Sequence, residues 1–203
     1  MSNFFKFDGT LDETYIDLGK ELLNMLKPVY LKNRQIIILC IGTDRCTGDA
    51  LGPFIGDKLN SMYLNNFFIY GTLEYPVHAK NLTSTIDKIY SIFKNPYIIA
   101  IDASLGKISD VGKISLKDSP LSPGLALKKD LPPIGNISIT GVVNMSGNFE
   151  FLVLQNTRLY TVILLSNTIS KALIYADRML SADTNSIIDA TDIFQLMQEK
   201  NNT

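Results

Sequence analysis

The fold is decided by the stretch Ile36-Ile-Ile-Leu-Cys-Ile-Gly-Thr-Asp-Arg-Cys-Thr-Gly-Asp-Ala-Leu-Gly-Pro-Phe-Ile-Gly56. It begins with an apolar run, continues through a glycine-rich polar segment, and then changes to an amphipathic pattern. A continuous apolar run is typical of a parallel strand that is buried on both faces. The stretch therefore predicts a strand, a loop and a helix in succession. In open α/β sheets, catalytic groups gather at the carboxyl ends of the strands, which is where this loop begins.

On both sides of this stretch, strand-like and helical patterns alternate along the first half of the chain. Strand-like runs at 67–73 and 97–102 alternate with helical patterns at 12–32, 49–64 and about 82–93. This order predicts an α/β fold of three layers, in which a mostly parallel sheet carries helices on both faces. In doubly wound sheets of this order, the first strand lies between the second and the third. The ends of the first and third strands are then neighbours.

The second half of the sequence is less regular. We expect a short strand at 112–117, a loop at 119–135 and a short helix at 147–156. Segment 137–143 has the composition of a strand, but it also fits a loop over the site. Segment 159–165 fits either a last core strand or the start of a long helix, and periodicity does not decide between them.

Length and composition indicate a single domain, 1–203, with a core over about 30–180 and a polar C-terminal tail at 181–203. The formal net charge is −1 and like charges form no run, so we expect no binding to nucleic acid or to an anionic membrane. The sequence shows no signal peptide, and we expect no apolar stretch near the ~18 residues that span a bilayer. Together with the low count of two cysteines, these features predict a cytoplasmic protein and leave its oligomeric state open.

The glycine-rich loop does not match a nucleotide-binding motif. Gly42 and Gly48 are separated by five residues, and Asp-Ala follows the second glycine. A dinucleotide fingerprint needs G-x-G-x-x-G, and a P-loop needs G-x-x-x-x-G-K-[ST]. Because neither pattern is present in the loop, its charged side chains are the candidates for chemistry.

Two aspartates and the single histidine are predicted to meet at the carboxyl edge of the sheet. Asp49 follows the first strand, His78 follows the second and Asp102 closes the third. Taken singly, each has a structural alternative, such as capping a helix or bonding the backbone of the next loop. Together, two close carboxyls can separate their pKa values and supply an acid and a base. The alternative for all three side chains is to hold a divalent metal ion.

Other polar residues near the predicted crevice are candidates for binding a substrate. Of the neighbouring charges Asp44 and Arg45, the arginine is the better candidate for holding a carboxylate or a carbonyl group. Asn144 and Ser146 belong to a polar segment that lines the crevice or caps a helix. Cys46 fits a thiol nucleophile with the histidine as its base, although a small loop residue is the favoured interpretation.

Several motifs, in order along the chain, resemble the YyaC sporulation proteins of endospore-forming Firmicutes. The motifs are Ile-Gly-Thr-Asp-Arg-Cys-Thr-Gly-Asp-Ala-Leu-Gly-Pro, Pro-Val-His-Ala-Lys-Asn-Leu, Ile-Asp-Ala-Ser-Leu-Gly and Asn-Phe-Glu-Phe-Leu-Val-Leu-Gln-Asn-Thr-Arg-Leu. The resemblance covers roughly residues 30–180. That family is similar in turn to the germination protease of spores and to the hydrogenase maturation proteases. The resemblance implies the phosphorylase/hydrolase-like α/β fold of these proteases. It also implies a location in the cytoplasm of the forespore or in the spore core.

The resemblance also implies roles for the aspartates. Asp49-Ala-Leu-Gly52 matches the end of the first loop of the hydrogenase maturation proteases, so Asp49 takes the place of their first metal-binding carboxylate, and Asp102 matches the second. Their third ligand is a later histidine, and this chain has none after His78. The germination protease instead relies on a pair of aspartates. The resemblance therefore implies a peptidase without a tightly held metal or other cofactor.

The predicted function is hydrolysis of a peptide bond during sporulation or spore germination, with Asp49 and Asp102 as the catalytic pair. The expected substrate is a protein or peptide, such as the small acid-soluble spore proteins. One alternative is a non-catalytic, protease-like sporulation protein that binds a peptide or protein partner. Another is a metal-dependent amidase. The residues predicted to bind the substrate are Asp44, Arg45, His78, Asn144 and Ser146.

Overall fold

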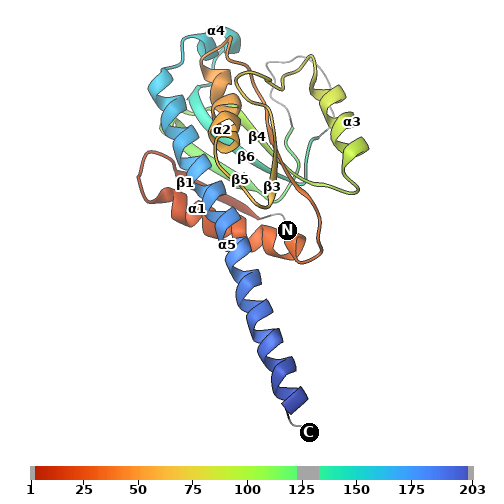
Figure 1. Cartoon of the computed structure of the whole chain (residues 1–203). Helices are drawn as coiled ribbons and strands as arrows, with labels where there is room; N and C mark the ends of the chain where they lie inside the picture. The colour runs from red at the N-terminus through yellow and green to blue at the C-terminus, as the bar shows by residue number, and fades with distance from the viewer. Residues whose placement is uncertain (1–2, 123–132, 201–203) are drawn as a thin grey trace.

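The structure is a computed structural model that describes residues 3–122 and 133–200, with side chains as far as residue 182. A six-stranded sheet forms its centre, in the order β1-β5-β6-β4-β2-β3. Figure 1 shows the helices packed around this sheet. The elements in chain order are β1 (Phe4–Asp8), α1 (Thr14–Tyr30), β2 (Ile36–Cys40), η1 (Gly48–Ala50), α2 (Leu51–Asn60), β3 (Phe67–Tyr70), α3 (Leu82–Ile92), β4 (Tyr97–Gly106), η2 (Ile108–Asp110), β5 (Lys113–Lys117), β6 (Ile137–Met145), α4 (Glu150–Gln155) and α5 (Leu159–Lys200).

The sheet is mixed, and its larger part is parallel. Strands β3, β2, β4 and β6 are neighbours and run parallel to one another. Strand β5 is antiparallel to β6, and β1 is antiparallel to β5. Strand β2 lies between β3 and β4, so the strand order predicted from the sequence is confirmed.

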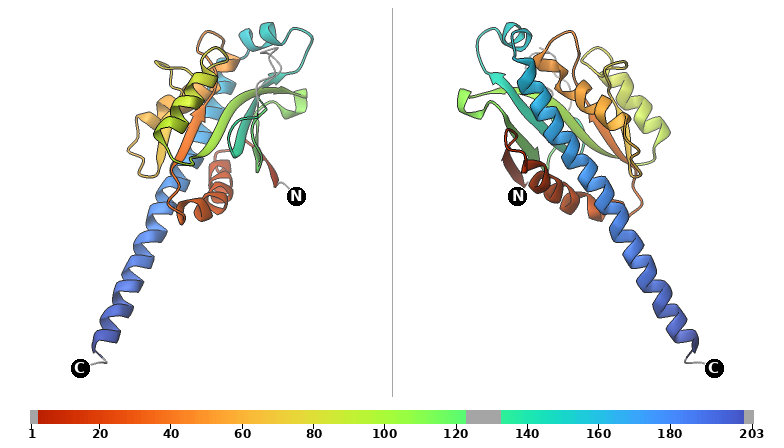
Figure 2. Two further views of the ribbon diagram at one scale, coloured as in Figure 1. Left: turned by 90° about the vertical axis from the view of Figure 1, so that its right-hand side faces the viewer. Right: turned by 60° about the vertical axis from the view of Figure 1, so that its left-hand side comes forward.

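Helices cover both faces of the sheet, which confirms the three-layer α/β fold (Figure 2). On one face, Ile36 and Ile38 of β2 pack in a core with α1, α2 and α5. On the other face, Ile37 and Leu39 pack in a second core with α3. Successive residues of β2 therefore point into opposite cores, which explains why the strand is apolar at every position. Its first polar groups follow where the strand ends, at the carboxyl edge of the sheet.

Some strand predictions need correction. Strand β4 continues to Gly106, so Asp102 lies inside the strand and does not close it. Residues 137–145 form strand β6 and not a loop, because β4 and β5 pair with it on either side. The sequence pattern does not predict β1, whose five residues pair with β5. Of the predicted loop 119–135, residues 123–132 lie outside the described part of the chain.

Segment 159–165 begins the long helix α5, which excludes the alternative of a last core strand. Its apolar residues recur at helical spacing, and Val162, Leu165 and Ile169 are fully buried in the core on the helix-rich face. The helix continues through 181–200, where the sequence contains no glycine or proline that would end it. Figure 1 shows its C-terminal part extending away from the sheet.

The expectation that no apolar stretch is long enough to span a membrane also needs correction. Segment Leu159–Ala182 of α5 has the required length and a mean hydropathy of 1.3. Half of this segment is buried inside the protein. Packing against the sheet and against α1 and α2 accounts for its apolar composition.

Candidate active site

The loop after β2 folds back over the end of its own strand. The backbone N–H of Thr43 donates to the carbonyl oxygen of Asp49 at 3.0 Å, and the N–H of Gly42 donates to that of Val77 at 2.8 Å. Gly42 has a φ of 139°, which favours glycine over other residues. A Cβ atom at this position would also collide with the carbonyl oxygen of Asp49. Gly42 therefore lets the loop bring Asp49 to the carboxyl edge of the sheet.

Asp102 lies at the first position of β4 beyond its pairing with β2. The ladder between the two strands ends at Cys40 and Ile101. On its other side, Asp102 is paired with Thr140 of β6. Because the chain turns away from the sheet after β2, a crevice opens beside Asp102. This is the place where β2 has β3 on one side and β4 on the other, and such switch points commonly hold ligands.

The two carboxyl groups have different surroundings. Asp102 is only 8% exposed, and its Oδ1 accepts the N–H of Ala103 at 2.8 Å. Burial raises the pKa of Asp102 well above its ordinary value, and the nearby charge of Asp49 raises it further. Burial also raises the pKa of Asp49, but the backbone N–H of Thr43 and the charge of His78 lower it in part. The pair therefore loses its first proton at Asp49, while Asp102 keeps its proton to a higher pH.

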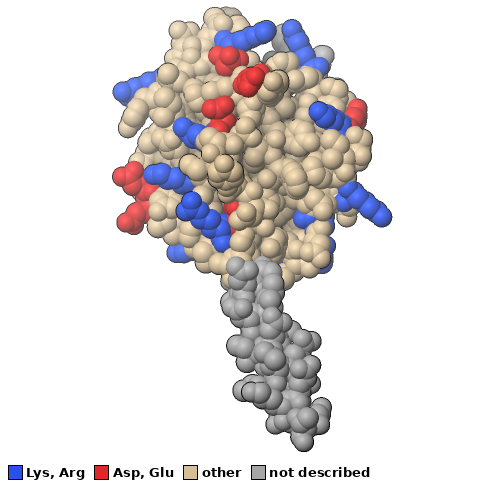
Figure 3. Space-filling model, in the orientation of Figure 1, with Lys and Arg blue, Asp and Glu red and all other residues tan. Residues whose placement is uncertain are grey.

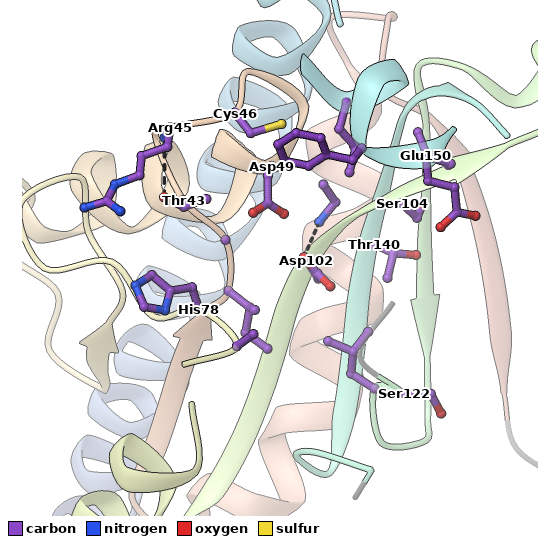
Figure 4. A pocket seen from close by; sticks show the side chains of 18 of the residues that line it. Thr43, Arg45, Cys46, Asp49, His78, Asp102, Ser104, Ser122, Thr140 and Glu150 are labelled. Carbon is purple, nitrogen blue, oxygen red and sulfur yellow. Dashed lines mark hydrogen bonds between the residues drawn. The ribbon is translucent and has the colours of Figure 1, made fainter. Parts of the chain in front are cut away.

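Both carboxyls line one cavity of about 730 Å³ at the carboxyl edge. In Figure 4, Asp49 and Asp102 point into the same space from opposite sides. The volume is within the range of ligand sites. The other labelled residues that line the cavity are Thr43, Arg45, Cys46 and His78 on one side, and Ser104, Ser122, Thr140 and Glu150 around Asp102.

His78 lies in the loop after β3 and lines the cavity from the side of Asp49. Its backbone N–H donates to Oδ1 of Asn81 at 2.8 Å, and its Nδ1 accepts the N–H of Lys80 at 3.3 Å. In a neutral ring this leaves the proton on Nε2, because one imidazole nitrogen donates when the other accepts. In its protonated form, His78 carries a positive charge that lowers the pKa of Asp49. Within the described residues, His78 is therefore a partner of the more exposed carboxyl.

Cys46 does not have the properties of an activated nucleophile. Burial raises the pKa of its thiol, and the charge of Asp49 acts in the same direction. The backbone N–H groups of Gly48 and Asp49 lower this pKa only in part. The nucleophile in thiol catalysis is the thiolate, which such surroundings disfavour. The alternative in which Cys46 acts with the histidine is therefore not supported.

Two of the predicted substrate-binding residues do not line the cavity. Arg45, His78 and Ser146 line it, whereas Asp44 and Asn144 do not. Asp44 is exposed. The side-chain amide of Asn144 donates to the carbonyl oxygen of Val153 and to the hydroxyl of Thr157, both at 3.2 Å. Asn144 thus has a structural role, because it ties the end of β6 to helix α4.

The carboxyls and the histidine are the ligands that the metal-site alternative would use. Within the described residues, no three His, Cys, Asp or Glu side chains are placed to hold one ion. Asp49 interacts electrostatically with His78 and with Asp102. Among the described residues, no preformed group of three ligands therefore supports the metal-site alternative.

Comparison with known proteins shows the family. Residues 9–172 match a family model with the description "Protein of unknown function (DUF1256)". The chain belongs to the DUF1256 family. It is also 48% identical over 145 residues to the protein of Bacillus subtilis (strain 168) named "Uncharacterized protein YyaC", and the match covers 71% of both chains. The resemblance to YyaC proteins is thereby confirmed.

Among solved structures, this DUF1256 protein is similar to the NiFe hydrogenase maturation protease HycI from Thermococcus kodakarensis KOD1. The TM-score is 0.42 at 16% sequence identity, and the match covers 70% of this chain and 90% of that chain. A likeness of this degree carries no argument about function. The function of the DUF1256 chain has to be argued from its own site.

Several residues that line the cavity were not predicted from the sequence. Ser104 follows Asp102 by two positions on β4, so it would have been predicted if the strand had been extended to its true end. Thr140 is identified by the register of β6, which the sequence does not show. Lys80, Glu150 and Phe151 also line the cavity, and although they lie within the quoted motifs, they were not predicted as site residues.

The surface charge of the DUF1256 protein is mixed on the face that Figure 3 shows. Lysines and arginines are interspersed there with aspartates and glutamates, and uncharged residues occupy most of the area. On this face the described residues form no continuous basic surface. The distribution agrees with the formal net charge of −1.

Proposed function

We propose that this protein is a peptidase in which Asp49 acts as the general base and protonated Asp102 polarises the carbonyl group of the scissile peptide bond. The observation that carries the proposal is the convergence of two carboxyls with unequal surroundings in one cavity. A pair of this kind holds one carboxylate and one protonated carboxyl at the same pH. The separation of the two protonation states is what acid–base hydrolysis requires.

The carboxylate of Asp49 accepts a proton from a water molecule, whose oxygen attacks the carbonyl carbon of the substrate. Asp102 donates a hydrogen bond to the carbonyl oxygen, where negative charge develops. Because Oδ1 of Asp102 already accepts the N–H of Ala103, the proton resides on Oδ2. When the C–N bond breaks, protonated Asp49 returns its proton to the departing amine. The products are a carboxylic acid and an amine, and both aspartates recover their starting states.

Other cavity residues support this role. The charge of His78 favours the ionised form of Asp49, which the base must adopt. Arg45 lines the same cavity and is suited to hold a carbonyl or carboxylate group of the substrate. We assign the substrate to proteins or peptides, and the place of action to sporulation or spore germination, because the sequence motifs resemble those of YyaC sporulation proteins.

The competing proposal is a protease-like protein that binds a peptide without cleaving it. The exposed side chains of Phe149 and Phe151 favour this second candidate, because exposed apolar residues are typical of binding surfaces. The two proposals differ in the effect of isosteric changes at the carboxyl pair. Loss of Asp49 abolishes turnover in the first case and changes affinity only modestly in the second.

The experiment is to incubate the purified wild type, Asp49→Asn and Asp102→Asn with small acid-soluble spore proteins and follow intact masses. Parallel samples contain a chelator. We expect fragments from the wild type, with or without chelator, and none from Asp49→Asn. Fragments that disappear with the chelator and return with a divalent ion would support the metal-dependent amidase instead. Intact substrate in every sample would support the binding protein.

A further inference from the structure

Helix α4 and the residue before it expose large apolar side chains beside the cavity. Its six residues lie between β6 and α5, and of these only Leu154 is buried. Phe151 is 63% exposed, and Phe149, directly before the helix, is 71% exposed. Large aromatic side chains contribute most when they are buried, so their exposure in one short segment is typical of a binding surface.

Hydrogen bonds and packing fix the position of helix α4, although only one of its side chains is buried. Asn144 and Thr157 bond to the carbonyl oxygen of Val153 at 3.2 and 2.9 Å. Leu154 packs against the backbone of Gly48, where an added Cβ would approach its Cδ2 to 2.7 Å. Because Gly48 directly precedes Asp49, α4 has a fixed position relative to the catalytic loop.

The two aromatic residues differ in where they lie. Phe151 and Leu154 line the cavity that contains Asp49 and Asp102, together with Leu105 of β4. Phe149 is not among the residues that line it. Leu105, Phe151 and Leu154 therefore line the same cavity as the two carboxyls. Phe149, an aromatic residue of similar exposure, does not line it.

We propose that Leu105, Phe151 and Leu154 form a subsite for a large apolar side chain of the polypeptide substrate, next to the bond that is cleaved. This inference rests on the proposed peptidase function and names the substrate class that the site selects. The occupant is a substrate side chain and not a second copy of the protein, because the apolar set is part of the wall of the catalytic cavity. Phe151 is the main determinant, since it is the largest and most exposed of the three.

The test measures binding in the Asp49→Asn background, so that no substrate is consumed. Two capped pentapeptides are the probes, acetyl-Ala-Ala-Phe-Ala-Ala-amide and the same peptide with serine in place of phenylalanine. Backbone amide shifts in NMR spectra report affinity and location. We expect the phenylalanine peptide to bind about 10-fold more tightly, the effect of burying part of one aromatic side chain. The shifts should lie at Leu105, Phe151 and Leu154.

Phe151→Ala and Phe149→Ala are the matched variants, since both remove an exposed phenylalanine from the same segment. We expect Phe151→Ala to abolish the preference for the phenylalanine peptide and Phe149→Ala to leave it unchanged. Equal binding of both peptides, no binding at millimolar concentration, or an equal effect of both variants would overturn the subsite. Concentration-dependent line broadening that only Phe149→Ala removes would instead identify self-association through the outer surface.

A cleavage assay on the same peptides, with the wild type, separates this inference from the proposed function. Selective binding without cleavage supports the subsite and contradicts the peptidase. Cleavage without a preference for phenylalanine supports the peptidase and contradicts the subsite.

Discussion

Two buried aspartates in this protein have opposite surroundings. Asp177 of α5 is 1% exposed, and its carboxylate accepts N–H groups from Asn65 at 3.1 Å and from Asn66 at 2.8 and 3.1 Å. Asp102 is 8% exposed, and among the described residues one hydrogen bond, from Ala103, reaches its carboxyl. The first carboxylate is fully engaged in fixing the segment before β3 to α5. The second faces a cavity and a neighbouring carboxyl.

The difference distinguishes a structural carboxylate, Asp177, from the carboxyl that we propose to be catalytic, Asp102. A buried charge is tolerated when several donors replace the water it has lost. Asp102 lacks this compensation, so its charged form is disfavoured and its pKa rises. Proteins retain such unfavourable placements mainly at functional sites. Changes at the two regions should therefore have opposite effects on stability and activity.

We expect the largest effect, a loss of activity, when Asp49, the partner of Asp102, is changed. Asp49→Asn keeps the shape of the side chain but removes the base, so we predict a loss in kcat of about 10³-fold, within the range of general-base removal. Stability should not fall, because a partly buried charge is removed. Peptide hydrolysis followed by mass spectrometry and urea unfolding measure the two quantities. A variant that keeps more than a tenth of the wild-type rate would contradict the assignment.

The next effect is expected at the structural carboxylate. Asp177→Ala leaves the backbone N–H groups of Asn65 and Asn66 without their partner, so we predict a loss of about 3 kcal/mol in the free energy of unfolding. Urea unfolding of the variant against the wild type measures this loss. Activity per folded molecule should remain within about two-fold, since Asp177 is not among the residues that line the cavity. A variant that keeps its stability and loses its activity would contradict the structural role of Asp177.

The smallest effect is a pH-dependent gain in stability in Asp102→Asn. The folded protein holds the proton of Asp102 to a higher pH than the unfolded chain, whose aspartates titrate near about 3.9. The wild type therefore loses stability as the pH rises from about 4 through the folded-state pKa. The variant lacks this loss, so its advantage should be absent below pH ~4 and should grow above it.

Urea unfolding at several pH values measures this advantage. Activity of Asp102→Asn should fall less than that of Asp49→Asn, because the amide group still donates a hydrogen bond. A variant less stable than the wild type at neutral pH would show that Asp102 is a stabilising carboxylate like Asp177.

The sequence predicted the fold well where burial on two faces dictates it. The apolar run of β2 and the βαβαβ order are sufficient to place Asp49 and Asp102 at one edge. The remainder depends on contacts that no local pattern shows. Asn144 and Ser146 are close in sequence, yet the end of β6 turns one toward α4 and the other toward the cavity. No local sequence pattern marks strand β1, and only its pairing with β5 identifies it as a strand.

The measurement that tests the central claim most directly is an NMR titration of the aspartate carboxyl carbons in the wild type and in Asp102→Asn. The claim is that the pair keeps one proton, on Asp102, after Asp49 has ionised. We predict two coupled transitions above the usual aspartate range, of which the later one is lost in Asp102→Asn. In that variant, the remaining transition, of Asp49, should lie at the same pH as the first transition of the wild type or at a lower pH. An Asp102 carboxyl that titrates near about 3.9 would contradict the claim, because both aspartates would then be ionised and no acid would remain.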